Sequence, residues 1–341
     1  MKTVVIAILV FGVIIMIHEL GHFVAAKLFG VKVNEFSLGM GPALFKFNRG
    51  ETDYSLRLLP IGGYVSMEGE NENSGDGRAF CNKPAWQRFI VLVAGAFMNL
   101  VLGFLLVIML VGRMELIGTT TVAGFYPDAV SSQWLQQYDT VVEINGYKVS
   151  GYSDTVFQMV RDRDCVIDFT VIRNGERVAL NGVAFETKSS SDGVSDTIVM
   201  DFQFYGQEKT FFNSLKYSFD WTVSIAKQVW YSLGDLLTGS YGMNQLSGPV
   251  GTLAAIGEAA SKGFDSLFLL VAFITINVGV FNLLPVPALD GGRLLFVLIE
   301  MIIRRPIPQK YESIIHATGL VLLLGLVVAV TFNDIFKLIT G

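Results

Sequence analysis

Charged residues are scarce in this chain of 341 residues: Asp, Glu, Lys and Arg make up 16% of it, against about 25% in typical soluble domains. Two cysteines are too few for a disulfide scaffold or a cysteine-rich zinc fold. The 30 acidic residues outnumber the 25 basic ones, so the chain lacks the excess of positive charge that nucleic-acid binding needs. Apolar residues instead reach 52%. This composition argues against an ordinary soluble enzyme and predicts segments that cross a bilayer.

Four stretches are long and apolar enough to cross a membrane, which takes about 20 residues in a helix. They cover residues 3–29, 89–112, 266–289 and 314–332. The first stretch also resembles a secretory signal, but no small-residue cleavage site follows it, so we expect it to remain as a span. The sequence therefore predicts a polytopic α-helical membrane protein with four transmembrane helices.

Lysine and arginine in short connecting segments predict the orientation of the spans, because these residues favour the cytoplasmic side. They are concentrated in residues 30–88 and 304–310. We therefore expect both segments in the cytoplasm, and both termini and the long segment 113–263 outside it. Cys81 and Cys165 then lie on opposite sides of the membrane and cannot pair.

Two regions between the spans carry strand and turn signals. Residues 44–58 alternate in polarity around a polar turn, which predicts a β-hairpin that follows the first span. An edge of this hairpin could pair with an extended peptide by strand addition. In the long outside segment, Asn145-Gly146 and Asn174-Gly175 separate short runs rich in β-branched residues, which predicts a small β-containing domain.

The candidate chemistry lies in the first span. His18 and His22 are four residues apart, so on a helix they share one face and both reach one metal ion, with Glu19 beside them as a base. The chain has only three histidines, and an ionisable residue at membrane depth costs at least about 2.5–3.5 kcal/mol. A purely structural His-Glu-His cluster is the alternative, and this cost argues against it.

A zinc hydrolase needs a third protein ligand, and Asp290 is the candidate. It follows the uncharged run of the third span, and Pro285 and Pro287 are expected to unwind the helix just before it. The rise of a helix then brings Asp290 and the two histidines toward the cytoplasmic half of the membrane. An ordinary interfacial carboxylate is the alternative.

These motifs resemble the site-2 protease family, the intramembrane zinc metalloproteases of regulated intramembrane proteolysis. The resemblance rests on residues 18–22 (HELGH) and 282–291 (NLLPVPALDG). Residues 37–65 resemble the membrane-reentrant β-hairpin region of the family, and Gly95 with Asn99 forms its G-x-x-x-N pattern. The outside domain resembles the single PDZ domain of bacterial members.

The resemblance implies zinc on His18, His22 and Asp290, Glu19 as the general base, and Asn277 and Asn282 near the substrate segment. It implies an intramembrane zinc endopeptidase of the bacterial cytoplasmic membrane, which cleaves transmembrane segments of substrates such as pre-trimmed anti-sigma factors or remnant signal peptides. No nucleic-acid partner is expected. The implied layout is a first transmembrane helix at 1–30, a cytoplasmic-side reentrant β-hairpin region at 31–88, a second helix at 89–112, an extracytoplasmic α/β PDZ-like domain at 113–190, an amphipathic linker at 191–263, a third transmembrane segment at 264–303 and a fourth helix at 314–338.

Departures from the family pattern and competing functions leave some roles open. Residues 134–139 (WLQQYD) replace the usual glycine-containing turn of the outside domain, which argues against tight capture of a peptide carboxylate. Interhelical hydrogen bonding is the alternative role for Asn277 and Asn282. Asn99 is expected to serve helix packing rather than catalysis, and an interfacial position is expected for His316. A transporter would show a repeated half, and none is visible. A catalytically dead membrane chaperone would tolerate loss of the ligands, yet all are present.

Overall fold

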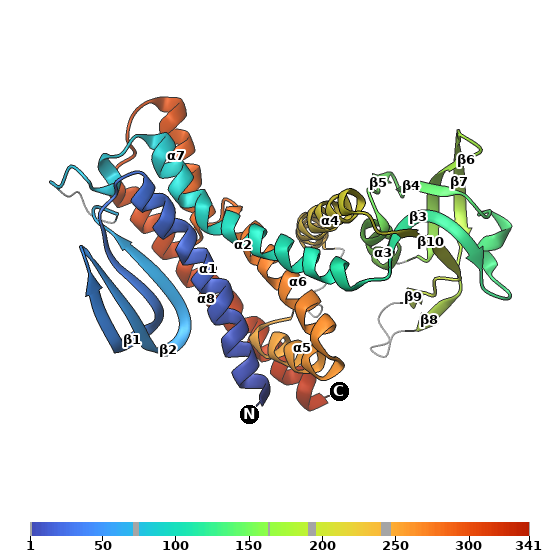
Figure 1. Cartoon of the computed structure of the whole chain (residues 1–341), viewed down its shortest axis with the longest axis horizontal. Helices are drawn as coiled ribbons and strands as arrows, with labels where there is room; N and C mark the ends of the chain where they lie inside the picture. Colours follow the sequence, from blue (N-terminus) through green and yellow to red (C-terminus); the bar gives the residue numbers. More distant parts are fainter. Residues whose placement is uncertain (1, 71–74, 163, 190–195, 240–246, 341) are drawn as a thin grey trace. The chain divides into compact units, whose positions relative to one another are not determined.

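The computed structural model describes residues 2–70, 75–162, 164–189, 196–239 and 247–340. The chain forms two compact units (Figure 1). The first contains Met1–Leu106 and Val229–Gly341, and the second contains Val107–Gln228. Two long helices, α2 (Ala85–Arg113) and α4 (Phe211–Leu237), have residues in both units.

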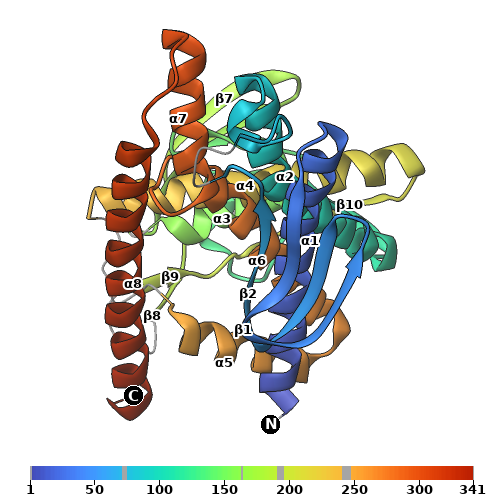
Figure 2. The same cartoon turned by 90° about the vertical axis from the view of Figure 1, so that its left-hand side faces the viewer.

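The first unit is mainly helical (Figure 2). Besides parts of α2 and α4, it contains α1 (Lys2–Leu28), β1 (Val33–Arg49), β2 (Thr52–Met67), the 3-10 turn η1 (Phe80–Asn82), α5 (Pro249–Lys262), α6 (Phe264–Leu283), α7 (Asp290–Ile303) and α8 (Gln309–Thr340). Within the described residues, four helices are long and apolar enough to cross a membrane, namely α1, α2, α6 and residues 310–337 of α8. These correspond to the four predicted spans.

The third of these helices is shorter than the sequence pattern predicted. It ends at Leu283 instead of residue 289. Pro285 and Pro287 follow at once, and proline cannot continue a helix because it lacks the N–H and clashes with the preceding turn. The unwinding expected at these prolines is therefore present, and a new helix, α7, begins at Asp290.

The strands β1 and β2 both fold back, so the predicted hairpin becomes a strip of four β segments. Residues 33–38 lie in its middle, paired with 52–57 on one side and with 63–67 on the other. Residues 43–49 pair with the far side of 52–57 and form the outer edge. The opposite edge, 63–67, is the one that lies against α1.

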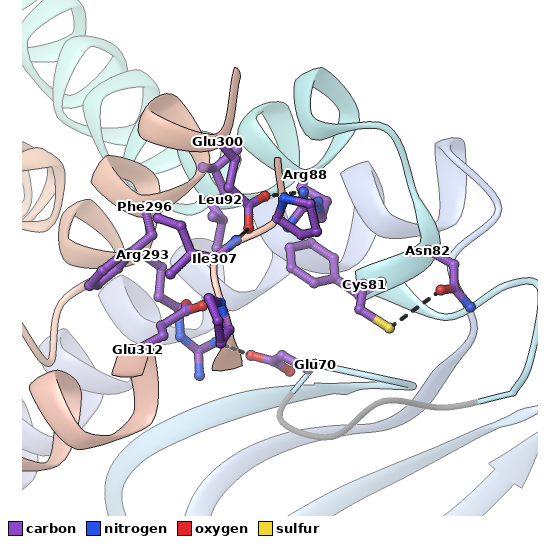
Figure 3. A pocket seen from close by; sticks show the side chains of 14 residues that line it. Glu70, Cys81, Asn82, Arg88, Leu92, Arg293, Phe296, Glu300, Ile307 and Glu312 are labelled. Atoms are coloured by element: carbon purple, nitrogen blue, oxygen red, sulfur yellow. Dashed lines mark hydrogen bonds and ion pairs between the residues drawn. The ribbon is translucent and has the colours of Figure 1, made fainter. Parts of the chain in front are cut away.

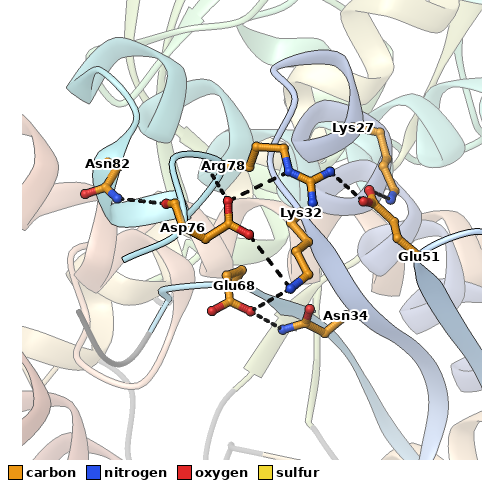
Figure 4. A network of polar contacts seen from close by, with 8 residues as sticks. All are labelled: Lys27, Lys32, Asn34, Glu51, Glu68, Asp76, Arg78 and Asn82. Atoms are coloured by element: carbon orange, nitrogen blue, oxygen red, sulfur yellow. Dashed lines mark hydrogen bonds and ion pairs between the residues drawn. The ribbon is translucent and has the colours of Figure 1, made fainter. Parts of the chain in front are cut away.

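A polar network fastens the turn of this strip to the end of α1 (Figure 4). Glu51 accepts hydrogen bonds from Lys27 at 2.7 Å and from Arg78 at 2.6 Å. Asp76 accepts a bond from the backbone of Arg78 at 2.8 Å and lies 3.8 Å from the ammonium group of Lys32. Each pair is partly exposed and contributes little to stability alone. Together the contacts set the position of the strip along α1.

The second unit carries a six-stranded sheet in the order β10–β3–β4–β6–β7, with β5 paired to β4. On β6, every second residue is buried, with Ile167, Phe169 and Val171 each at most 1% exposed, as expected for a strand with one face on a core. A single helix, α3, connects β5 to β6. The elements are β3 (Leu116–Phe125), η2 (Val130–Gln133), β4 (Thr140–Ile144), β5 (Tyr147–Lys148), α3 (Tyr152–Arg161), β6 (Val166–Arg173), β7 (Glu176–Ala184), β8 (Thr187–Ser189), β9 (Asp196–Ile198) and β10 (Phe202–Glu208).

Both Asn-Gly turns are present where the sequence predicted them. Asn145 and Gly146 have φ values of 47° and 79°, and Asn174 and Gly175 have 53° and 85°. Two successive positive φ angles are what a tight two-residue hairpin turn requires. These turns fix the register of β4 with β5 and of β6 with β7.

Candidate metal centre

Helix α1 brings two imidazole rings to one place, as their spacing predicts. The Nε2 atoms of His18 and His22 lie 3.2 Å apart. The two side chains expose only 12% and 9% of their surface. Each ring therefore directs one nitrogen into a shared and largely buried position.

Asp290 reaches the same position from the start of α7. Its Oδ2 lies 3.0 Å from Nε2 of His18 and 3.2 Å from Nε2 of His22. The segment before it makes this approach possible, because the helix has ended and Ala288 turns the chain with a φ of 78°. The structure thus brings together the three side chains that the sequence proposed as one cluster.

The three atoms fit a single tetrahedral metal ion. Two ligands on a tetrahedral zinc, with bonds of about 2.0–2.1 Å, lie about 3.3 Å apart. The observed separations are 3.0, 3.2 and 3.2 Å. Two imidazole nitrogens and a carboxylate oxygen are also a donor set of zinc hydrolases, which keep a fourth position for water. Within the described residues, no other group of three His, Cys, Asp or Glu side chains is found with this convergence.

Helix α2 contacts the second ring nitrogen, Nδ1, of both histidines. Nδ1 of His22 donates a hydrogen bond of 2.8 Å to the backbone carbonyl of Val91, which leaves the lone pair of its Nε2 for a metal. Nδ1 of His18 lies 3.3 Å from the amide Nδ2 of Asn99. Asn99 is fully buried. The sequence had assigned Asn99 to helix packing, and the structure shows that it also contacts a ring of the cluster.

Glu19 lies next to the cluster without being one of its three members. Its side chain lies close to the β strip. A Cβ atom added to Gly63 would lie 3.2 Å from Cγ of Glu19 and 3.0 Å from Cγ2 of Ile15. Glycine at position 63 therefore allows the edge segment 63–67 to come this near to α1. Glu19 consequently has a β edge beside it.

His316 on α8 has a role that the sequence did not reveal. Its Nδ1 accepts a hydrogen bond of 3.1 Å from the backbone N–H of Ala288. The ring also packs against Phe296, with 5.9 Å between centroids. His316 therefore holds the turn that delivers Asp290. Its expected position at the membrane interface stays a prediction. Its place among only three histidines was the one available signal.

Asn277 and Asn282 both lie on α6, and both are partly exposed. The Oδ1 atom of Asn277 is buried without a hydrogen-bond partner among the described residues. Neither residue belongs to the cluster of His18, His22 and Asp290. Their contact with a substrate stays a prediction.

A polar cavity of about 460 Å³ lies beside the helix that carries Asp290 (Figure 3). Arg293, one turn along α7 from Asp290, forms an ion pair there with Glu70. Arg88 at the start of α2 forms a second pair with Glu300 of α7. These pairs tie α7 to α2 and to the segment that follows β2.

Known proteins resemble this chain over nearly its whole length. A family model described as peptidase family M50 matches residues 6–326. A putative zinc metalloprotease of Fusobacterium nucleatum is 36% identical over 343 aligned positions, which cover 98% of this chain and 99% of the relative. A putative zinc metalloprotease of Clostridium acetobutylicum is 38% identical over 336 positions, or 97% of each chain. The regulator of sigma-W protease RasP of Bacillus subtilis is 28% identical over 425 positions, with 99% of each chain covered.

Proposed function

Because the chain belongs to peptidase family M50 and is a zinc metalloprotease, we propose that it is an intramembrane endopeptidase that cleaves transmembrane segments of other membrane proteins. The position of the metal cluster carries this proposal. His18 and His22 lie on α1, a helix long and apolar enough to cross a membrane, and Asp290 joins them just after a second such helix. A peptide bond that reaches the cluster would therefore come from within the bilayer.

His18, His22 and Asp290 would hold the zinc ion, which supplies Lewis-acid activation of water and of the scissile carbonyl. Glu19 would act as the general base. Its carboxylate takes a proton from the attacking water and returns that proton to the amide nitrogen of the leaving strand. Loss of Glu19 would then stop cleavage without removing a metal ligand.

A substrate helix must unwind before cleavage, because a helix keeps its carbonyls and N–H groups in its own hydrogen bonds. The β edge at 63–67 lies nearest Glu19 and would bind the unwound substrate by strand addition. This edge replaces the one at 44–58 that the sequence suggested. Asn277 and Asn282 would hold freed backbone groups of the substrate, and hydrogen bonds between helices are their alternative role.

The second unit would be a PDZ-like domain outside the cytoplasm. A six-stranded sheet with a single helix between β5 and β6 supports the PDZ-like assignment. The concentration of Lys and Arg in residues 30–88 and 304–310 supports the orientation. The unusual turn before β4 is engaged internally, because Arg173 donates to both carboxylate oxygens of Asp139 at 2.8 and 2.6 Å. Because this turn is held by an internal ion pair, it is not arranged to bind a peptide terminus. We therefore favour exclusion of bulky substrates as the role of the domain.

The substrates would be membrane proteins whose outside part has already been shortened. The relative RasP is named a regulator of sigma-W protease, which supports pre-trimmed anti-sigma factors as one substrate class. Remnant signal peptides are the second class, since they too are short segments with one span. The lipid bilayer is then part of the working environment of the enzyme.

Cleavage of a single-span reporter in liposomes tests the proposal. The reporter carries a different tag at each end, and mass spectrometry of the products maps the cut. We expect cleavage inside the apolar segment, its loss after chelation and its return with added zinc. Cuts confined to the water-exposed tails would show a surface protease instead.

A further inference from the structure

The amide group of Asn99 lies directly behind the ring of His18. Asn99 is 0% exposed, and its Nδ2 is 3.3 Å from Nδ1 of His18. Its Oδ1 is buried and has no hydrogen-bond partner among the described residues. A buried amide carbonyl without a partner is costly, about 1–3 kcal/mol, and indicates a second arrangement or a missing partner.

As drawn, the NH2 group of Asn99 faces His18. An amide NH2 group can only donate, so in this orientation Nδ1 of His18 accepts and Nε2 carries the ring proton. That N–H points at Oδ2 of Asp290, 3.0 Å away. A protonated Nε2 has no lone pair for a metal. His22 differs, because its Nδ1 donates to the carbonyl of Val91 and its Nε2 keeps the lone pair.

A half-turn of the Asn99 amide reverses this arrangement. The two ends of a carboxamide have nearly the same shape, so one pocket accepts either orientation. With Oδ1 toward His18, the carbonyl accepts the N–H of Nδ1, and the lone pair of Nε2 is directed at the cluster. His18 then matches His22, and the unpartnered carbonyl of Asn99 gains a donor.

We propose that Asn99 is a positioning residue for zinc, whose side-chain carbonyl accepts the N–H of Nδ1 of His18. This hydrogen bond would leave the lone pair of Nε2 for the metal. The proposal rests on the assignment of His18 as a metal ligand. Helix α2 would then supply an acceptor behind each histidine, the backbone of Val91 for His22 and the side chain of Asn99 for His18.

Zinc affinity of the full-length chain in nanodiscs, measured by competition with a chelator, tests the proposal. Asn99→Leu removes the acceptor at similar volume, and we expect zinc binding about 10- to 100-fold weaker. Asn99→Asp keeps an acceptor but no donor, and we expect zinc binding within about threefold of the unmodified chain. Thr275→Val is the matched control, because Thr275 is buried beside the backbone of Asn99 and donates only to its carbonyl, at 3.4 Å.

Nitrogen NMR of the histidine rings gives a second readout, which three histidines make readable. We expect the Nδ1–H of His18 in the zinc-loaded chain to show the downfield proton shift of a hydrogen-bonded imidazole. A merely structural role for Asn99 would leave this N–H without its carbonyl acceptor, and the shift would stay near that of a free imidazole N–H. This measurement uses the unmodified chain, so it tests the proposal even if Asn99→Leu does not fold.

Three results would overturn the proposal. These are full zinc affinity in Asn99→Leu, an equal loss in Asn99→Asp and Asn99→Leu, or an Nδ1 of His18 in the zinc-loaded chain that is unprotonated or not hydrogen-bonded. His18→Ala separates this failure from that of the ligand assignment. If His18→Ala binds zinc as tightly as the unmodified chain, then His18 is not a ligand and the fault lies in the proposed site itself.

Discussion

The ring of His22 occupies the space that a side chain at position 95 would need, since an ideal Cβ on Gly95 would lie 2.3 Å from Nε2 of His22. The same helix pair meets closely at a second point, where a Cβ on Gly21 would lie 2.3 Å from the carbonyl oxygen of Ala94. Small residues let helices approach in this way. The face of α1 that carries His18 and His22 therefore fits against α2 only because both positions lack side chains.

Gly95→Ala should displace the ring of His22 and reduce zinc binding. Overpacking of this kind costs about 1–3 kcal/mol, so we also expect a lower melting temperature. Gly112→Ala is the control on the same helix, because nothing lies within 4 Å of its added carbon. Zinc content by mass spectrometry and thermal unfolding measure both effects. Unchanged zinc content and stability in Gly95→Ala would contradict the packing argument.

The ion pair between Arg88 and Glu300 should stabilise the contact between α2 and α7. The two side chains are only 17% and 9% exposed, and Glu300 also accepts a hydrogen bond of 2.8 Å from the backbone of Ile307. Glu300→Leu leaves Arg88 buried without its partner, at a cost of about 3–5 kcal/mol. We expect the double variant Arg88→Met with Glu300→Leu to recover much of that loss, because both charges are then gone. If the losses in melting temperature of Arg88→Met and Glu300→Leu simply add in the double variant, the two side chains do not stabilise the fold as a pair.

The proposed orientation predicts which positions are open to a membrane-impermeant maleimide in intact cells. Lys148 is exposed in the second unit, and Cys81 is partly exposed in the first. We expect labelling of Lys148→Cys in intact cells and of Cys81 only after the membrane is opened. Cys165 is buried and should stay unlabelled in the folded chain. The reverse pattern for positions 148 and 81 would invert the topology.

Acid should loosen the contact between α3 and α4 in the second unit. Burial alone would raise the pKa of Asp154, but hydrogen bonds from Ser150 and Ser224 and the charge of Lys227 outweigh it and hold the pKa below its ordinary value. A carboxylate with a lowered folded pKa contributes stability above its unfolded pKa of about 3.9 and loses that contribution as the pH falls through the folded value. Thermal unfolding between about pH 5 and pH 3 measures the loss. Asp154→Asn should show a flatter dependence, and an equal slope in both proteins would contradict this role.

Much of the site followed from local sequence signals. The spacing of His18 and His22 on a helix is a local property, and the prolines before Asp290 predict the end of the preceding helix. The Asn-Gly turns of the second unit required nothing beyond their two residues. For these features, the chemistry of a short segment decides the structure.

Contacts between distant segments could not be predicted in this way. The sequence does not reveal that β10 pairs with β3, or that the β edge at 63–67, and not the one at 44–58, lies beside Glu19. The bond from Ala288 to His316 joins a loop to a different helix. Such contacts depend on how distant segments pack against one another, and the sequence of one chain carries little record of that packing.

Replacement of Glu19 by glutamine tests the central claim most directly. Glutamine keeps the shape of the side chain but cannot accept the proton of the attacking water, and it leaves His18, His22 and Asp290 in place. The measurement compares zinc content and cleavage of a single-span reporter in liposomes for Glu19→Gln and the unmodified chain. We predict zinc equal to that of the unmodified chain and no detectable cleavage within the span. Cleavage by Glu19→Gln within about tenfold of the unmodified rate would contradict the account, because a general base contributes about 10²–10⁴-fold.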